Sequence, residues 1–279
     1  MSSLAAHAVA ALDDAIAHLA RAEVAAEDVH ESRKRLKEVR ALARLCAGSK
    51  PLRAELRAAA RQLAPSRDDD ALVEAFDKLR KHFGERRFAN VRNALLNRSC
   101  ALPDVAAVAT SLRRLRPRVQ SLHLRDKLPK TDCRLRRALR KAATTRSPED
   151  FHELRKRAKD LSYQARFFGA DADSLHDLAR ILGDHHDLVL LRRIVHNSDL
   201  DALIAIRLFQ LERRATNLGR RLIARKAVRM RPVPARIRSN ASAPAASAPR
   251  KTPAPRASAP SSGRAPSASR RTTSTTDSR

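Results

Sequence analysis

The chain has 279 residues with a hydrophobic fraction of 43%, enough for one large folded domain or two small ones. Its 58 lysines and arginines outnumber 30 acidic residues, and the net charge of +28 indicates a polyanionic partner: nucleic acid, an anionic membrane or a phosphate polymer. Only six glycines are present, and alanine, leucine and arginine dominate, which favours helices over β-hairpins.

Signals for membrane insertion or secretion are missing from the sequence. No segment has the roughly 18 consecutive apolar residues of a membrane span, and Asp13 and Asp14 interrupt the apolar N-terminal stretch. Cys46, Cys100 and Cys133 form no CxxC pair, which is typical of a reducing compartment. We therefore expect a cytoplasmic protein without a membrane partner.

Helical periodicity extends from about residue 4 to residue 228, where apolar residues recur at spacings of three and four. The best marked helix start is at Ser147, with serine at the N-cap, proline at the next position and Asp150 in a capping-box position. Proline and glycine predict the breaks between helices. These lie at Lys50-Pro51, Ala64-Pro65, Gly84, Leu102-Pro103, Leu128-Pro129, Ser147-Pro148, Gly169 and Gly183.

The composition changes after Arg231. From Pro232 to Arg279 the chain consists mainly of alanine, proline, serine, threonine and arginine, with nine basic residues and one acid. Its net charge of +8 leaves +20 for the preceding residues. Because this segment has almost no large apolar side chain, burial cannot offset the entropy cost of ordering it. We predict a helical domain over residues 1–228 and a disordered basic tail over residues 232–279.

Two nearly matching stretches carry the strongest pattern: VHESRKRLKEVRALARL, which begins at Val29, and FHELRKRAKDLSYQARFF, which begins at Phe151. On a helix, the histidine and several basic side chains of each stretch share one narrow stripe, and apolar side chains occupy the opposite face. The stripes are His30, Arg33, Lys34, Lys37 and Arg44 in the first stretch and His152, Arg155, Lys156, Lys159 and Arg166 in the second. Ala41 and Tyr163 occupy matching positions on them.

The acidic residues beside the stripes are placed to pair elsewhere. Glu31 precedes Arg35 by four residues, and Glu153 precedes Arg157 by four, the favourable orientation for an ion pair on a helix. Such pairing would leave the stripes uncompensated, whereas a merely solvated face would interleave the two signs. We therefore interpret the stripes as binding surfaces for a polyanion.

A second element recurs after each stripe: QLAPSRDDDALVEAF and RILGDHHDLVLLRRI, in which Asp68 matches Asp187. The chain is thus predicted to contain two related helical halves, at about 4–105 and 106–228. Related halves commonly pack about a pseudo-twofold axis, and this packing would turn the two stripes toward one another. Both aspartates follow expected helix breaks, so we predict that they cap helix starts or pair with arginine.

At these residues the chain resembles the CHAD family, the conserved-histidine α-helical domain. The matching motifs follow the family's order over roughly residues 5 to 226. They are His30-Glu31-x-Arg33-Lys34-Arg35-x-Lys37, Arg67-Asp68-x-Asp70, Arg134-x-x-Arg137-x-x-Arg140, His152-Glu153-Leu154-Arg155-Lys156-Arg157-x-Lys159 and Leu182-Gly183-Asp184-x-x-Asp187. The chain departs from the family pattern at Ser162, where a basic residue is common, and at His186, where asparagine is common.

The resemblance implies an all-α fold of two four-helix bundles related by pseudo-twofold symmetry, with a central basic surface that binds inorganic polyphosphate. It also implies a location at polyphosphate granules and a triphosphate-processing enzyme as partner. Polyphosphate has many charges and no bases, so a binder needs many cations on a rigid scaffold. The predicted polyphosphate-binding residues are His30, Arg33, Lys34, Lys37, Arg44, Arg134, Arg137, Arg140, Lys141, His152, Arg155, Lys156, Lys159 and Arg166.

We expect no catalytic residue, metal or cofactor, although two further roles stay open for parts of the chain. The histidines His30 and His152 either donate hydrogen bonds to phosphate or have a structural role at a helix start, and the neighbouring cations favour the neutral imidazole. The tail, finally, has the composition of a basic arm that neutralises a nucleic-acid backbone. A granule-coat role is compatible with polyphosphate binding, because a coat must hold its polymer.

Two alternatives compete with polyphosphate binding. Nucleic-acid binding is disfavoured as the main function because only 3% of the residues are aromatic, and base-stacking surfaces need aromatic rings. A metal-dependent phosphohydrolase would use residues of metal-ligand type, which are His176, Asp184, His185, His186 and Asp187. Adjacent histidines diverge by about 100° on a helix, however, and the nearby cations repel a divalent ion.

Overall fold

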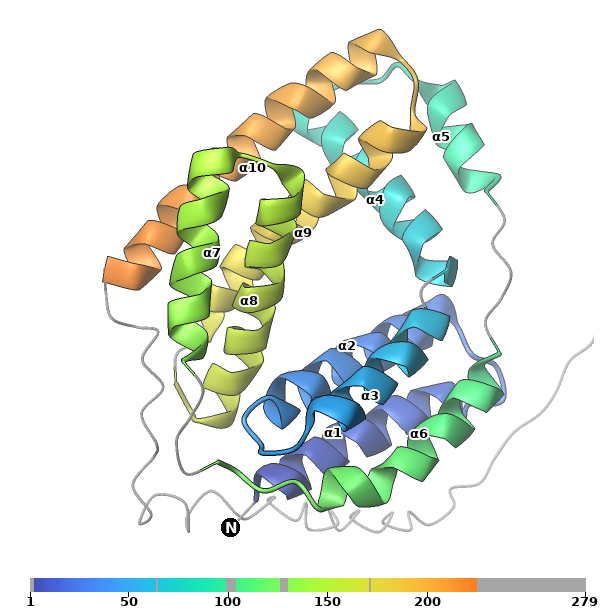
Figure 1. Ribbon diagram of the computed structural model, residues 1–279. Helices are drawn as coiled ribbons and strands as arrows, with labels where there is room; N and C mark the ends of the chain where they lie inside the picture. The colour runs from blue at the N-terminus through green and yellow to red at the C-terminus, as the bar shows by residue number, and fades with distance from the viewer. Residues whose placement is uncertain (1–2, 64, 99–103, 126–129, 171, 225–279) are drawn as a thin grey trace, which may run out of the picture. The chain divides into compact units, whose positions relative to one another are not determined.

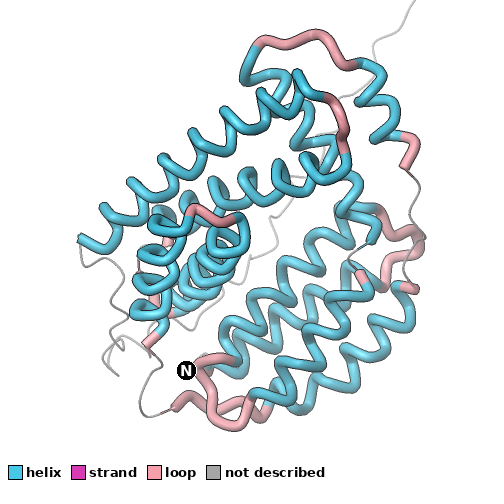
Figure 2. Tube along the Cα trace, turned by 45° about the horizontal axis from the view of Figure 1, so that its top comes forward, coloured by secondary structure: helices cyan, strands magenta, loops and turns pink. Residues whose placement is uncertain are grey.

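The computed structural model describes residues 3–63, 65–98, 104–125, 130–170 and 172–224, with the backbone alone over residues 65–70. The chain divides into two units, residues 1–242 and 243–279, and the predicted tail lies outside the described residues. The described residues form ten helices joined by loops, which confirms the all-α prediction (Figures 1 and 2). The helices are α1 (Leu4–Leu19), α2 (Ala26–Ala43), α3 (Lys50–Gln62), α4 (Pro65–Phe83), α5 (Ala89–Leu96), α6 (Val105–Gln120), α7 (Thr131–Thr145), α8 (Pro148–Phe167), α9 (Asp173–Ile194) and α10 (Ser198–Ala224).

Capping and proline signals fix several helix boundaries where they were predicted. The side chain of Ser147 accepts a hydrogen bond from the backbone N–H of Asp150 at 3.2 Å, and α8 begins at the next residue, Pro148. The helix α4 ends before Gly84, whose φ of +64° lies in the left-handed region that glycine adopts without strain. The predicted breaks at Leu102-Pro103 and Leu128-Pro129 lie outside the described residues.

The break predicted near Gly183 is wrong, because α9 continues through this residue. Leu182 and Leu188 on either side of it are buried, so packing keeps the helix intact despite the poor helix propensity of glycine. A Cβ atom at Gly183 would lie 3.4 Å from Nη2 of Arg155, so glycine leaves room for this guanidinium against the helix backbone. Asp187 is therefore inside α9 and caps no helix start; the side chain of its counterpart Asp68 lies outside the description.

The buried side chains form two hydrophobic cores within the first unit. One core is built by α1, α2, α3 and α6, and it contains the fully buried Leu36 and Leu112. Figure 1 shows α6 alongside α1 and α3, which it contacts. The other core is built by α4, α5, α7, α8, α9 and α10 and contains Phe76 and Phe151.

These cores do not follow the predicted division of the sequence into residues 4–105 and 106–228. The helices α4 and α5 pack with the later helices, and α6 packs with the first three. Helical periodicity shows which face of a helix is apolar, but it does not show which other helix covers that face. The pseudo-twofold relation between the halves stays a prediction.

The two stripe-bearing helices, α2 and α8, are in direct contact. The side-chain amide of Gln164 on α8 donates a hydrogen bond of 2.7 Å to the buried backbone carbonyl of Ala41 on α2. Close by, Nε of Arg44 lies 2.9 Å from Oδ2 of Asp160. A buried amide and an ion pair thus fix α8 against α2.

None of the described helices is both long and apolar enough to cross a lipid bilayer.

Candidate functional site

A pocket of about 450 Å³ lies where α2, α3 and α8 meet. Its lining contains eight cationic side chains, and its acids are Glu153 and Asp160, so it carries six net positive charges when His152 is neutral. The half-buried ring of Tyr163 is also part of the lining. The cations are Lys37, Arg40 and Arg44 from α2, Arg57 from α3, and Arg155, Lys156, Arg157 and Lys159 from α8. We call this cavity, with the eight cationic side chains that line it, the basic pocket.

Six of the fourteen predicted binding residues line this pocket: Lys37, Arg44, His152, Arg155, Lys156 and Lys159. The other eight do not: His30, Arg33, Lys34, Arg134, Arg137, Arg140, Lys141 and Arg166. The pocket residues from α2 lie in its C-terminal half. The predicted residues nearer its start, His30, Arg33 and Lys34, therefore lie outside the lining. The four residues of α7 are exposed on a different helix, and Lys141 there pairs with Asp150 at 2.8 Å.

The stripes are partly compensated, contrary to the sequence prediction. Lys34 pairs with Glu31 at 3.0 Å, and Lys156 pairs with Glu153 at 2.6 Å, in both cases three residues apart on the helix. The predicted pair between Glu153 and Arg157 is present. These pairs lie at or near the surface, where an ion pair stabilises by only a few tenths of a kcal/mol.

The predicted pair between Glu31 and Arg35 is replaced by two others. Arg35 lies 3.3 Å from Glu38 on the same helix and 3.5 Å from Asp14 on α1. The carboxylate of Glu38 is almost fully buried, and its pKa is lowered by hydrogen bonds from His7 and Arg35. Arg35 thus fastens α2 to α1, a tertiary contact that spacing along one helix cannot reveal.

Sequence reasoning missed three cations of the lining: Arg40, Arg57 and Arg157, which it had assigned only to a pair with Glu153. Arg40 is half-buried, and its pKa is lowered first by burial and then by the positive charges of Arg57 and Arg44. On a helical wheel Arg40 lies about 80° from His30, just outside the narrow stripe, so a wider arc would have included it. Arg57 is on α3, which carries no repeated motif, and only the packing of α3 beside α2 brings it to the pocket.

Asp160 is the acid that organises the pocket cations. Its Oδ2 atom lies 2.9 Å from Nε of Arg44 on α2 and 3.8 Å from Nη1 of Arg157 on its own helix. Burial raises the pKa of Asp160, and the charges of Arg44 and Arg157 oppose that rise. The carboxylate therefore holds two guanidinium groups beside the cavity without occupying all of their donors.

The imidazoles of His152 and His186 are in contact at the edge of the pocket, with ring centroids 4.3 Å apart. Burial lowers the pKa of His152, and the charges of Lys156 and Arg155 lower it further. The pKa of His186 is lowered to about 3, first by burial and then by His152. Both rings are therefore neutral at pH 7, as the cationic surroundings of His152 had indicated.

This contact predicts a loss of stability in mild acid. The unfolded chain protonates His186 near its ordinary pKa of 6.5, whereas the folded chain resists protonation down to about 3, so stability falls as the pH drops below 6.5. Full exclusion of water would make the loss from His186 about 2 kcal/mol between pH 7 and pH 5, and solvent screening reduces it to about 1 kcal/mol. Urea unfolding at both pH values measures this change.

The variant His186→Asn should lose about 1 kcal/mol less than the natural protein over the same pH interval. His176→Asn is the matched control, because His176 is exposed on the same helix. If His186→Asn and the natural protein lose equal stability, the imidazole contact does not control the acid response.

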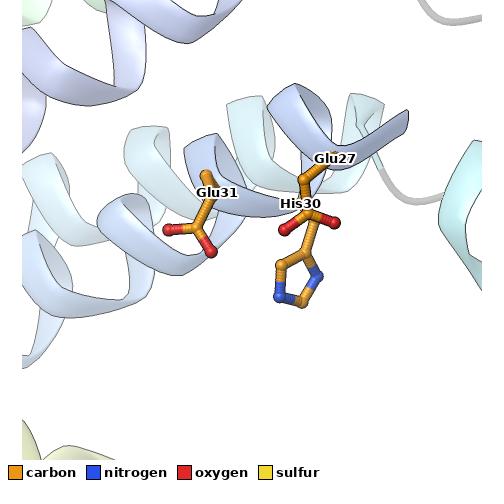
Figure 3. Close-up of side chains that lie close together, drawn as sticks. All are labelled: Glu27, His30 and Glu31. Atoms are coloured by element: carbon orange, nitrogen blue, oxygen red, sulfur yellow. The ribbon is translucent and has the colours of Figure 1, made fainter. Parts of the chain in front are cut away.

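The residues of metal-ligand type on α9 point to different neighbours. The ring of His185 packs against Phe151, and its Nε2 atom lies 3.4 Å from Glu212 on α10, whereas His186 contacts His152. The predicted divergence of the adjacent histidines is therefore confirmed. Within the described part of the chain, donor atoms are close enough for one metal ion only in a group on the first turns of α2, drawn in Figure 3.

That group consists of Glu27, His30 and Glu31, whose donor atoms lie within 4.8 Å of one another. All three come from one helix, and Glu31 is already paired with Lys34. His30, which the sequence places among the polyphosphate ligands, thus lies between two carboxylates instead of in the lining of the basic pocket (Figure 3).

Comparison with protein families gives one match: the family model described as CHAD domain covers residues 4–196. This range includes α1 to α9 and therefore both stripe-bearing helices. Comparison with the curated proteins and with the solved structures finds no match. CHAD domains are associated in general with the binding of polyphosphate or triphosphate. Since the family model spans more than half of the 279 residues, the chain belongs to the CHAD domain family.

Proposed function

We propose that the protein binds inorganic polyphosphate in the basic pocket and has no enzymatic activity of its own. The observation that carries this proposal is the convergence of eight cationic side chains from three helices on one cavity with two acids. A net charge of six in so small a volume destabilises the unliganded protein by self-repulsion. A chain of phosphates relieves that repulsion at every position it occupies.

The chemistry of the lining suits phosphate oxygens. Five of the eight cations are arginines, whose planar fork donates to two oxygens at once, and three are lysines, which act as mobile point charges. Asp160 holds Arg44 and Arg157 in place before the ligand binds, so less side-chain conformational entropy is lost on binding. The pocket therefore favours a ligand with closely spaced charges.

Nucleic acid fits the pocket less well. The lining has one aromatic ring besides the imidazole of His152, that of Tyr163, and this ring is half-buried. Base-stacking sites use exposed aromatic rings. We retain backbone binding by the tail as a second activity because of its net charge of +8, although the tail lies outside the described residues.

Two wider roles follow as part of the proposal. A protein that holds polyphosphate is suited to a polyphosphate granule in the cytoplasm, and its ligand is chemically close to the substrate of a triphosphate-processing enzyme. Such an enzyme is the partner that we propose.

The test is a calorimetric titration of the full chain with long-chain polyphosphate and with duplex DNA, at equal phosphate concentration and about 150 mM salt, where surface charges are well screened. We expect polyphosphate to bind at least about 10-fold more tightly than DNA, because only a flexible phosphate chain can enter the pocket. Equal affinities for the two polymers would show a generic cationic surface and would overturn the proposal.

A further inference from the structure

A second pocket of about 320 Å³ lies between the C-terminal end of α7 and one face of α10. The α10 side of it is a stripe of Phe209, Arg213, Thr216 and Arg220, which recur at spacings of three and four residues. Arg146, just after α7, completes the stripe from the opposite side. None of the eight cations of the basic pocket lines this cavity.

The arginines of this second pocket are unneutralised. Within the residues that the structure describes, Arg146, Arg213 and Arg220 form no ion pair with a carboxylate, although other arginines of the chain commonly do. The acid of the lining is Glu212, which lies one turn from Phe209 and more than two turns from Arg220. Three arginines and one acid leave the lining with a net charge of +2, and Arg220 is the arginine of the stripe farthest from that acid.

The Phe209 end of the stripe is built differently. Phe209 is 51% exposed, which makes it one of the few large apolar side chains that face solvent. The guanidinium carbon of Arg146 lies 5.6 Å from the centre of its ring. Arg146 has a φ of +52°, a left-handed conformation that is strained for a residue other than glycine. A strained backbone thus places a cation over an exposed ring, a combination that is typical of binding sites.

From these features we infer that the pocket between α7 and α10 binds a nucleoside diphosphate or triphosphate. The base stacks against Phe209 and the Arg146 guanidinium, and the phosphates lie along Arg213 and Arg220. Along the helix axis, Arg213 lies about 6 Å from Phe209 and Arg220 about 16 Å from it, so both arginines lie on the same side of the ring at increasing distance. Thr216 supplies a hydroxyl between the two arginines.

This site is independent of the proposed polyphosphate site, because the two cavities share no residue. An inorganic phosphate chain would pair with Arg146, Arg213 and Arg220 but would leave the exposed ring of Phe209 without a role. A free nucleoside would leave the arginines without a partner. Only a ligand with a flat base at one end and phosphates at the other uses both ends of the stripe.

The experiment is a titration of the full chain with ADP, pyrophosphate and adenosine, repeated on four variants. Phe209→Ala is expected to weaken ADP binding about five-fold or more and to leave pyrophosphate binding unchanged. The double variant R213A/R220A is expected to weaken ADP binding about 10-fold or more. The control R113A/R114A removes the same charge from exposed positions on α6 and should change ADP binding less than about two-fold.

Three outcomes would overturn the inference. One is ADP binding that Phe209→Ala leaves intact, or that pyrophosphate equals in affinity, since either would show an anion site without base recognition. The second is tighter binding of a single-stranded oligonucleotide than of ADP, which would identify a nucleic-acid surface. The third is loss of ADP binding in the double variant R40A/K159A, which would place the nucleotide in the basic pocket. All of the altered residues except Arg40 and Lys159 are exposed, so circular dichroism should show intact folds.

Discussion

Replacing Arg40 and Lys159 with alanine is expected to weaken polyphosphate binding about 100-fold, because each charge-assisted hydrogen bond to phosphate contributes about 1.5 kcal/mol or more. Arg40 comes from α2 and Lys159 from α8, so the double variant removes one cation from each wall of the basic pocket. Calorimetric titration with long-chain polyphosphate measures the change. Arg40 has most to contribute, since it is half-buried among like charges that a bound phosphate would neutralise.

The control for this prediction is R113A/R114A, which removes two exposed arginines from α6 and is expected to weaken binding about two-fold at most. A comparable loss in both variants would mean that affinity follows total charge and that the pocket has no special part in it. Removal of repulsion should also make the pocket variant slightly more stable to urea than the natural protein, so weak binding cannot be ascribed to unfolding.

Asp160→Asn is expected to lower the free energy of unfolding by about 3 kcal/mol. The substitution keeps the shape of the side chain but leaves Arg44 without its counter-charge in a mostly buried position, where the Arg44 and Asp160 side chains are 20% and 16% exposed. Arg157 loses one of its two acidic partners and keeps Glu153. The substitution also removes the ion pair between Asp160 and Arg44 that holds α8 against α2. Urea unfolding at pH 7 measures the loss.

Polyphosphate should restore much of the lost stability in this variant, because bound phosphate supplies the missing negative charge and stabilises the folded state by mass action. The matched control is Asp177→Asn on α9, whose pair with Arg180 is more than half exposed and contributes at most a few tenths of a kcal/mol. If Asp160→Asn unfolds no more easily than Asp177→Asn, the carboxylate does not organise the pocket.

The local features of the fold could be predicted from the sequence, because they depend on residues close together in the chain. Ser147 and Pro148 fixed the start of α8, and Gly84 the end of α4. The helix break predicted at Gly183 was wrong because burial of the neighbouring side chains stabilises α9 there. This tertiary effect outweighs the low helix propensity of glycine. The assignment of α6 to the first core also depends on long-range packing and has no local signal.

The candidate site was predictable to the extent that it follows single helices. Periodicity placed Lys37 and Lys159 on the correct faces of α2 and α8, and both line the pocket. It could not separate them from Arg33, which shares the stripe but lies outside the lining, because the end of α2 that meets α8 is decided by packing. Arg57 came from a helix without any motif, so only the assembled structure could reveal it.

The interleaved composition of the two cores has a consequence for synthesis on the ribosome. The nascent chain makes α1 to α3 first, then α4 and α5 for the other core, and only then the α6 that completes the first. The apolar face of α4, with Phe76 and Leu79, has only α2 and α5 against it until α9 has emerged. An exposed face of this kind invites aggregation during elongation, and neither core is encoded by an uninterrupted run of helices.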